Sequence, residues 1–504
     1  MKYFNLDIYS HYFTISHLVD KAYEMVLQLN DYCTQRGYIG MGKNATFGVV
    51  RVFNSVVLNG KEYHYHISLL DKLKQLIVSF NFINCYNLTK HDLVPPTIIH
   101  APIREGWVAR DYQEPIIDYI LEEGAIKLIS VATGKGKSSI ALMAISKLKM
   151  KTLILIKATF LDKWVGDIQN VLDVSPERIN VIQGSDALQK LIYMNSEGID
   201  ESDFIVMSVS TYYNYIQLYE KFGDDILELG YSMRPSDFLP GCGIGVVLMD
   251  EVHMLYGQQF TAMLYMHTHK LIGLSATFFT KDRELETMYR MGFPINLRYK
   301  ETLNEKYIYV TAISYRFRKP EKIRYTEYGS NMYSQTAFEK CIMRHVPTRE
   351  RYIEMICEQV NKAYISRYQP GDKCLVFAGT IKMCEFIRDK LRTLYPERSC
   401  EKYTAEDPYE NAILPDIRVS TIGSLGVGID IPGLTTCIMS VSIDSIQSSR
   451  QSIGRLRKIP NRDVYFYYLY SEDIDKHVRV HHGKRKTLGH IAISFAERYY
   501  NKNI

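Results

Sequence analysis

A glycine-rich segment between a strand pattern and a helix pattern constrains this chain more than any other feature of its sequence. Residues 126–131 are typical of a buried strand, residues 132–138 read Ala-Thr-Gly-Lys-Gly-Lys-Ser, and residues 140–145 are apolar throughout. Glycines let backbone N–H groups turn toward a phosphate, and a helix start adds a partial positive charge. The general pattern begins with glycine, where this chain has Val131. The order of strand, loop and helix predicts a nucleotide-binding P-loop within an α/β fold.

This loop predicts ATP and Mg²⁺ as ligands. Lys137 is expected to reach the β- and γ-phosphates of ATP, and Ser138 is expected to ligate Mg²⁺. The other residues expected to cradle the phosphates are Thr133, Gly134, Lys135, Gly136 and Ser139.

A second pattern, downstream of the P-loop, ends in two acids. Apolar residues 246–249 are typical of a buried strand, and Asp250 and Glu251 follow directly. Asp250 at the strand end is expected to hold Mg²⁺ through water, and Glu251 to orient and deprotonate the attacking water. An acidic pair alone is common at strand ends, but after a P-loop it indicates ATP hydrolysis.

Alternation of short apolar strands with helical patterns divides the 504 residues into zones. It runs through residues 101–300 and again through 301–490, which predicts two parallel sheets covered by helices. Residues 1–100 are expected to form a small α+β accessory domain that binds DNA, and residues 491–504 a tail. The other interpretation is that residues 1–100 do not bind DNA and only stabilise the domain formed by residues 101–300.

The N-terminal zone contains a strong hairpin signal. Asn59-Gly60 separates two β-rich runs, because both residues tolerate positive φ, and a helix is expected over residues 70–78. Side chains of Arg51, Lys61, His64 and His66, beside Tyr63 and Tyr65, could contact phosphates and unpaired bases. The alternative is that the tyrosines pack inward and the histidines face water.

Composition favours an ordinary globular protein. The net charge is only +5, and no apolar run approaches the roughly 18 residues of a membrane helix. The nine cysteines form no Cys-x-x-Cys pair, which argues against a zinc site and for a reducing compartment. We therefore expect a cytoplasmic protein, in the host cytoplasm if a phage encodes it, with no membrane and no zinc.

The order of these motifs resembles that of superfamily-two helicases, over most of residues 105–490. Asp250-Glu251-Val252-His253 is a DExH box, and Gln113 matches the glutamine that reads adenine in this family. The resemblance implies two RecA-like domains in tandem, with ATP held between them. It also implies that His253, Ser275 and Thr277 couple ATP hydrolysis to the nucleic-acid track.

The second half contains the family's later motifs. Residues 421–433 match motif five, with Gly428 and Asp430 expected at the nucleotide. Gln451-Ser-Ile-Gly-Arg455 matches motif six, with Gln451 and Arg455 expected to be catalytic. The family's second arginine finger falls on Lys458 by strict count, and Arg457 lies one residue earlier. We interpret Arg457 as that finger, because lysine lacks the bidentate fork of arginine.

Nucleic acid is the partner that the resemblance implies. The hydroxyls expected to contact the sugar–phosphate backbone are those of Thr159, Thr211, Thr380 and Thr421. A basic C-terminal stretch adds three expected phosphate contacts, Lys484, Arg485 and Lys486.

Within the superfamily, a small N-terminal α+β module and a DExH box look like the UvsW-type branch-migration helicases of bacteriophages. That resemblance implies an ATP-dependent DNA helicase or translocase acting on forks, D-loops and Holliday junctions. Replication or recombination proteins would be its partners. Two alternatives stay open, an RNA helicase and the motor subunit of a restriction system.

Overall fold

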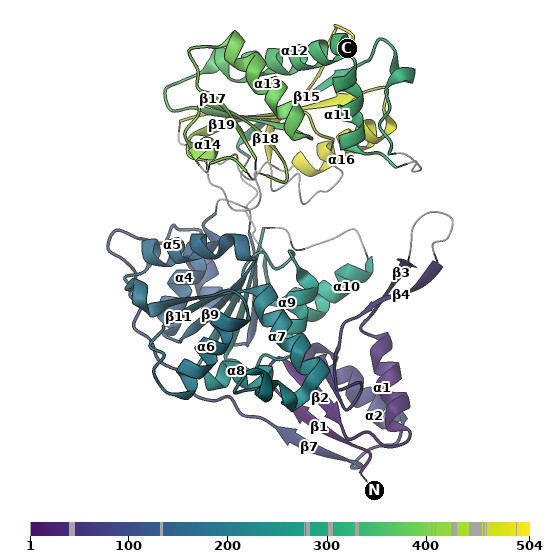
Figure 1. Cartoon of the computed structure of the whole chain (residues 1–504), viewed down its shortest axis with the longest axis vertical. Coiled ribbons are helices and arrows are strands. Elements are labelled where there is room, and N and C mark those ends of the chain that lie inside the picture. The colour runs from purple at the N-terminus through teal and green to yellow at the C-terminus, as the bar shows by residue number, and fades with distance from the viewer. Residues whose placement is uncertain are drawn as a thin grey trace. The chain divides into compact units, whose positions relative to one another are not determined.

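The computed structural model contains two compact units, each with its own parallel sheet (Figure 1). One comprises Met1–Val131 with Lys135–Lys300, and the other Glu301–Ile504. The residues that the structure describes are 2–39, 46–131, 135–276, 278, 283–300, 306–327, 332–404, 406–408, 410–424, 431–442, 456, 459, 461–489 and 491–504.

The N-terminal part of the first unit has a five-stranded sheet with the order β5-β6-β2-β1-β7 and a separate pair, β3-β4. Its elements are β1 (Phe4–Ile8), β2 (Tyr12–Ser16), α1 (Ala22–Asp31), β3 (Thr34–Ile39), β4 (Thr46–Val52), β5 (Ser55–Val57), β6 (Glu62–His66), α2 (Leu70–Ser79) and β7 (Tyr86–Lys90). The expected hairpin is confirmed in β5-β6, whose turn residues Asn59 and Gly60 both have positive φ. The helix predicted over residues 70–78 is confirmed as α2.

The rest of the first unit is a seven-stranded parallel sheet with its helices. Its elements are α3 (Glu114–Leu121), β8 (Ile126–Ser130), α4 (Lys137–Leu148), β9 (Thr152–Ile156), α5 (Leu161–Val171), β10 (Ile179–Ile182), α6 (Ser185–Ser196), β11 (Phe204–Ser208), α7 (Val209–Phe222), α8 (Pro235–Gly241), β12 (Val246–Met249), α9 (Tyr256–Met263), β13 (Lys270–Ser275), α10 (Arg283–Gly292) and β14 (Arg298–Lys300).

The second unit is a further seven-stranded parallel sheet. Its elements are β15 (Ile308–Tyr315), α11 (Gln335–Arg344), α12 (Val346–Ala363), β16 (Lys373–Ala378), α13 (Ile381–Leu394), β17 (Cys400–Tyr403), α14 (Glu410–Ile413), β18 (Ile417–Thr421), β19 (Leu434–Met439), β20 (Val464–Ser471), α16 (Asp475–Leu488) and β21 (Ala492–Tyr499).

The two parallel sheets share one topology. Their strand orders are β10-β11-β9-β12-β13-β8-β14 and β17-β18-β16-β19-β20-β15-β21. Numbered from the first strand of each sheet, both orders read 3-4-2-5-6-1-7. The predicted fold class, two RecA-like parallel-sheet domains in tandem behind a small N-terminal α+β region, is confirmed.

Strand side chains alternate between two apolar layers in the first sheet. Leu153 and Leu155 of β9 belong to one hydrophobic cluster, and Ile154 and Ile156 belong to the other. Helices α3, α4 and α5 supply the second cluster, whereas α6 to α9 supply the first. A strand that is buried on both faces is apolar over most of its length, which is why β9 continues with Leu-Ile-Leu-Ile after Thr152.

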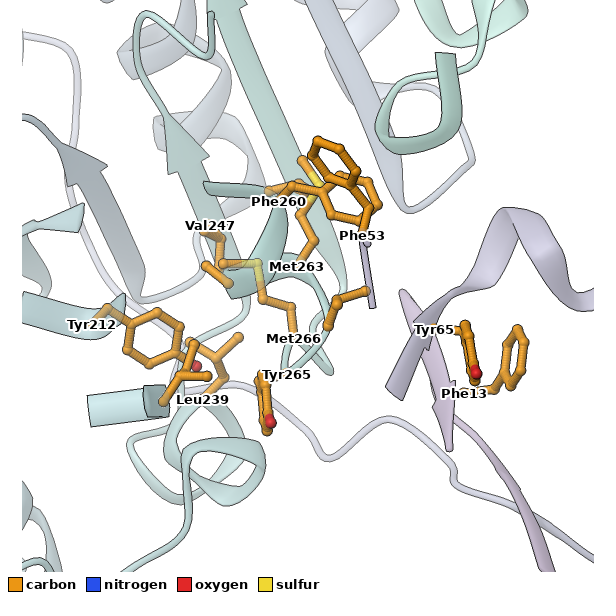
Figure 2. Packing of buried hydrophobic residues seen from close by; sticks show 14 of the residues in the cluster. Phe13, Phe53, Tyr65, Tyr212, Leu239, Val247, Phe260, Met263, Tyr265 and Met266 are labelled. Carbon is orange, nitrogen blue, oxygen red and sulfur yellow. The ribbon is translucent and has the colours of Figure 1, made fainter. Parts of the chain in front are cut away.

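The N-terminal sheet shares a core with the first parallel sheet. Figure 2 shows Phe53, which precedes β5, beside Phe260 of α9, and the two rings meet edge to face with centroids 5.5 Å apart. Polar contacts cross the same junction: His64 Nδ1 lies 2.9 Å from the Leu264 carbonyl oxygen, and Ser55 Oγ lies 2.6 Å from Tyr265 Oη. Removing residues 1–98 would therefore expose much of this shared apolar surface.

This packing corrects our expectation for the hairpin side chains. Tyr65, His64 and His66 are buried, so their rings face the core and cannot meet DNA. Burial lowers the pKa of His66 to about 3, because a charged imidazole loses its hydration there. The inward-packing alternative holds for Tyr65, whereas its other half, that the histidines face water, is wrong for His64 and His66.

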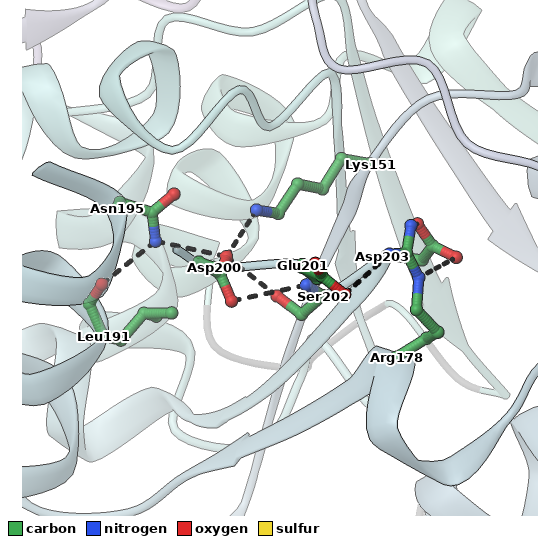
Figure 3. A network of polar contacts seen from close by, with 8 residues as sticks. All are labelled: Lys151, Arg178, Leu191, Asn195, Asp200, Glu201, Ser202 and Asp203. Atoms are coloured by element: carbon green, nitrogen blue, oxygen red, sulfur yellow. Dashed lines mark hydrogen bonds and ion pairs between the residues drawn. The ribbon is translucent and has the colours of Figure 1, made fainter. Parts of the chain in front are cut away.

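A polar network braces one edge of the first parallel sheet (Figure 3). The Asp200 carboxylate accepts hydrogen bonds from Lys151 Nζ at 2.6 Å and Ser202 Oγ at 2.9 Å. Arg178 forms a bidentate pair with Asp203, at 3.1 and 2.6 Å. Burial disfavours the Asp200 charge, but the bonds from Lys151 and Ser202 outweigh it and lower its pKa. These residues lie where β9 and β11 begin, opposite the edge where the P-loop lies.

We predict that His64→Ala destabilises the first unit by about 2 kcal/mol, because the Leu264 carbonyl loses its partner and a void opens in the core. Tryptophan fluorescence during urea unfolding measures this selectively, since both tryptophans, Trp107 and Trp164, lie in the first unit. The control is His100→Ala, an exposed histidine of the same unit. Equal unfolding free energies for the two variants would contradict a shared core.

Candidate active site

The candidate site is built on the carboxyl ends of neighbouring parallel strands. Because β8, β9, β12 and β13 all run in one direction, the loops that follow them lie at one edge of the sheet. These loops contain the predicted P-loop, the acidic pair and the Ser275 segment. Ligands of open α/β sheets bind at this edge.

The P-loop ends in a left-handed glycine that begins α4. Gly136 has φ +75° and is followed by Lys137 and Ser138 at the helix start, where the unpaired N–H groups lie. Gln113 braces the loop, because its Nε2 donates to the Lys135 carbonyl at 3.0 Å and its Oε1 accepts from Arg110 N at 3.0 Å. A Cβ on Gly136 would lie 2.7 Å from Gln113 Nε2, so the close approach requires glycine.

Asp250 is held by hydrogen bonds on both carboxylate oxygens. Its Oδ2 accepts from the Trp164 indole Nε1 at 2.9 Å, and its Oδ1 accepts from the Glu251 backbone N–H at 2.8 Å. The Asp250 carboxylate is therefore fixed at the end of β12. Trp164, on α5, is fully buried, and a buried indole N–H needs an acceptor.

Glu251 is a buried acid in a strained position. Its φ is +46°, a left-handed conformation that is rare for a residue with a side chain. Burial raises the pKa of its carboxyl to about 7; Asp250 adds to this effect, while Lys137 and Lys163 oppose it. Its Oε2 is buried and accepts no hydrogen bond from the residues that the structure describes.

His253 connects the acidic loop to the end of β13. Its Nδ1 lies 2.9 Å from Ser275 Oγ and 3.4 Å from Glu251 Oε2. Burial lowers the pKa of His253 to about 4, and the charge of Lys137 adds to this effect. The structure thus brings His253 and Ser275 together, as coupling residues require, although the coupling itself stays a prediction.

The residues at this edge fit ATP and Mg²⁺. Mg²⁺ binds oxygen ligands such as hydroxyls and carboxylates. Ser138 provides a hydroxyl at the helix start, and Asp250 provides a carboxylate at the strand end. The unsatisfied Glu251 Oε2 is an acceptor placed for a water molecule. Lys163 stands near the acids: burial disfavours its charge, but Asp250 and Asp167 outweigh this and raise its pKa.

Two of the four predicted backbone-contacting hydroxyls lie in the first unit. Thr159 is exposed in the short turn after β9. Thr211 is buried, and its hydroxyl accepts from Gly184 N at 2.9 Å and bonds Ser208 Oγ at 2.7 Å. The expectation for Thr211 is therefore wrong, because its hydroxyl supports the start of α7 and does not face a strand of nucleic acid.

The other two hydroxyls belong to the second unit, where Thr421 is the last residue of β18 and Thr380 lies two residues after β16. Thr380 caps α13 and donates to Glu339 Oε2 at 2.8 Å. Thr421 Oγ1 lies 2.7 Å from Ser424 Oγ. Both are partly exposed, and nucleic-acid contact remains a prediction for each.

The basic stretch on α16 is smaller than the sequence indicates. Lys484 is buried, with Nζ over the Tyr468 ring at 4.8 Å from its centroid, and burial lowers its pKa to about 8. It cannot contact phosphate, so that expectation is wrong. Arg485 is exposed but pairs with Glu497 at 3.0 Å, and Lys486 is exposed.

Several predicted site residues lie outside the residues that the structure describes, and their roles stay predictions. They are Thr133, Gly134, Thr277, Gly428, Asp430, Gln451, Arg455, Arg457 and Lys458.

Two further properties concern the described residues alone. Every helix among them is too short or too polar to cross a bilayer. The same residues contain no group of three or more His, Cys, Asp or Glu that could hold a metal ion.

Comparison with known proteins finds similarity to helicases. Residues 107–280 match the family model described as "Type III restriction enzyme, res subunit". A helicase/translocase subunit XPB of the general transcription and DNA repair factor IIH, from Enterocytozoon bieneusi, is 21% identical over 93% of this chain and 78% of its own length. A protein of Acanthamoeba polyphaga mimivirus whose name includes "ATP-dependent RNA helicase L396" is 22% identical over 71% of this chain and 62% of its own length.

Among solved structures, T4 UvsW aligns over 98% of this chain and 99% of its own, with 11% identity and a TM-score of 0.35. Together, the P-loop helix, the DExH acids and the helicase relatives define the class of this protein. The chain is an ATP-dependent helicase, and its motifs are similar to those of superfamily two.

We predict that Lys137→Ala abolishes ATP hydrolysis, because the charge on the β- and γ-phosphates is then uncompensated in the transition state. The loss should exceed about 100-fold in a steady-state assay with purified full-length protein. Lys147→Ala, on the last turn of the same helix, is the control. Turnover close to wild type in Lys137→Ala would refute the assignment of the phosphate site.

Trp164→Phe is predicted to reduce ATP turnover roughly tenfold, because Asp250 loses a charge-assisted hydrogen bond while the aromatic packing is kept. Half-maximal activity should also require more Mg²⁺, since Asp250 is the proposed metal residue. Trp107→Phe, at a more exposed position, serves as control. An unchanged Mg²⁺ requirement in Trp164→Phe would mean that the indole only fills space.

Proposed function

We propose that this helicase remodels branched DNA, namely forks, D-loops and Holliday junctions, as it moves along a strand and hydrolyses ATP. The observation that carries the proposal is the rigid attachment of the N-terminal sheet to the ATP-binding lobe. A motor that contacts only the sugar–phosphate backbone does not distinguish a branch from a plain duplex. A second surface at a fixed distance from that motor can make the distinction.

The attachment is polar as well as apolar. Thr268 N donates to Ser10 Oγ at 3.0 Å, and His267 Nε2 lies 2.9 Å from the Asp92 carbonyl oxygen. These contacts tie both ends of the N-terminal region to the loop before β13. Buried polar contacts of this kind fix orientation, because each one is satisfied in only one arrangement.

The chemistry proposed for the site follows from its geometry. Lys137 and the helix start bind the phosphates, and Ser138 with Asp250 would hold Mg²⁺, which compensates the charge of the phosphates when bound. Glu251 accepts the proton of the attacking water, and its buried, unsatisfied Oε2 is the atom available for it. Trp164 keeps the Asp250 carboxylate in place.

The names of two similar proteins bear on whether the motor moves along DNA or RNA. One relative is named for transcription and DNA repair, which favours DNA over RNA as the track. A second relative is named as an RNA helicase, and this keeps RNA as the alternative substrate.

The proposal predicts a definite order of substrates for the purified full-length protein. Unwinding should be fastest on forks and four-way junctions, while single-stranded DNA alone stimulates ATP hydrolysis. Blunt duplexes and matched RNA duplexes are the comparison substrates, all at one salt concentration, because phosphate contacts make affinity salt-dependent. Faster unwinding of RNA than of any DNA would replace this proposal with the RNA-helicase alternative.

A further inference from the structure

The β3-β4 pair, here called the ribbon, is a two-stranded sheet that joins no other sheet among the described residues. Its strands are antiparallel, with Thr34 opposite Val52 and Ile39 opposite Thr46. Figure 1 shows it extending away from α1 and from the five-stranded sheet. An isolated two-stranded ribbon is marginally stable in water by itself, so its persistence in a fold invites a functional explanation.

Apolar side chains are exposed on both faces of the ribbon. Phe47 is 65% exposed, and the consecutive residues Val49 and Val50 are 50% and 51% exposed. Successive strand residues point to opposite faces, so Val49 and Val50 expose apolar surface on both faces of β4. Exposed apolar side chains on a two-stranded ribbon also promote aggregation, which is a cost that a binding role would offset.

The charge of the surrounding sequence indicates the kind of partner. Residues 32–61 contain no aspartate or glutamate, and their basic residues are Arg36, Lys43, Arg51 and Lys61. Because these thirty consecutive residues carry no negatively charged side chain, they would attract a polyanion and repel few of its phosphates. This composition favours nucleic acid over an ordinary protein surface.

The base of the ribbon is fixed to the ATP-binding lobe. Arg51 Nη2 donates to the Gly257 carbonyl at 3.1 Å, and the Arg51 guanidinium lies 5.0 Å from the Phe53 ring centroid. Gly257 is the second residue of α9, the helix that follows the DExH loop. A Cβ on Gly257 would lie 1.8 Å from Arg51 Nη1, so this close approach depends on glycine.

We propose that the ribbon contacts DNA at the branch point and places Phe47, Val49 and Val50 against unpaired or unstacking bases. The proposal rests on the branched-DNA function above and names the element that recognises the branch. Apolar wedges and aromatic rings hold opened base steps by stacking, and each such contact is worth about 1–3 kcal/mol. The Arg51–Gly257 contact keeps the wedge in register with the catalytic lobe.

The test is a triple variant of the full chain, Phe47→Ser with Val49→Ser and Val50→Ser. The control, Leu27→Ser with Val78→Ser, removes side chains that are 66% and 62% exposed on α1 and α2 of the same unit. Unwinding of forks and four-way junctions should fall at least roughly tenfold in the ribbon variant, as loss of one or two stacking contacts implies. Hydrolysis of ATP stimulated by single-stranded DNA should stay within about twofold of wild type, and the control should match wild type in both assays.

A photocrosslinking residue at position 47 supplies an independent measurement in a protein with its ribbon otherwise intact. It should crosslink to nucleotides at the branch of a four-way junction, and not to the ends of its arms. Crosslinks confined to a second copy of the chain or to an added protein would overturn the proposal, as would a ribbon variant that unwinds branched DNA normally. A parallel loss of ATP hydrolysis and unwinding would show that the ribbon supports the motor itself.

The same assays distinguish failure of the branched-DNA function from failure of the ribbon's role. Wild-type protein that does not prefer branched DNA removes the proposed function and the ribbon's role together. Wild-type protein that prefers branches, combined with an unaffected ribbon variant, removes the ribbon's role alone.

Discussion

Two carboxylates that are adjacent in sequence, Asp250 and Glu251, are buried at the end of β12, and much of the catalytic lobe is arranged around them. Burial of adjacent acids is unfavourable unless their charges are compensated. Asp250 accepts hydrogen bonds from the Trp164 indole and from the Glu251 backbone N–H. Glu251 instead has a pKa raised to about 7 by burial. The different environments of these neighbours assign one to the metal and the other to proton transfer.

The same lobe is continuous with the N-terminal sheet, and this continuity connects catalysis to substrate choice. Helix α9 begins shortly after the acidic pair, packs Phe260 against Phe53 and accepts a hydrogen bond from Arg51 at Gly257. The ribbon, which we propose contacts DNA, is thus separated from the catalytic acids by a single helix, α9. A separate domain on a flexible linker would not have this property.

Sequence patterns predicted the elements whose signals are local. The P-loop strand and helix, the strand before the acidic pair and the Asn59-Gly60 hairpin all follow from short-range periodicity and turn chemistry. Spacing also predicted that both halves contain parallel sheets, because repeated strand–helix alternation allows few other folds.

Side-chain direction and long-range partners could not be predicted in this way. Lys484 lies in a basic run, yet it is the position of α16 that faces the Tyr468 ring. His64 and His66 look like solvent-facing polar residues in the sequence, but both are buried, His64 beside Tyr265 and His66 beside Phe260. The Trp164–Asp250 bond joins residues 86 apart in the chain, so only tertiary packing reveals it. The sequence of strand β4 in the ribbon is a recognisable β-rich run, but the exposure of its apolar side chains cannot be predicted from that pattern.

The roles of the two acids are tested by comparing single-turnover ATP hydrolysis by Glu251→Gln with nucleotide binding by the same variant. Glutamine has nearly the same shape as glutamate but cannot take the proton of the attacking water. We expect ATP affinity within a few-fold of wild type and hydrolysis slower by at least about 100-fold, the usual contribution of a general base. Hydrolysis at the wild-type rate would show that another residue activates water and would contradict the roles assigned to the two acids.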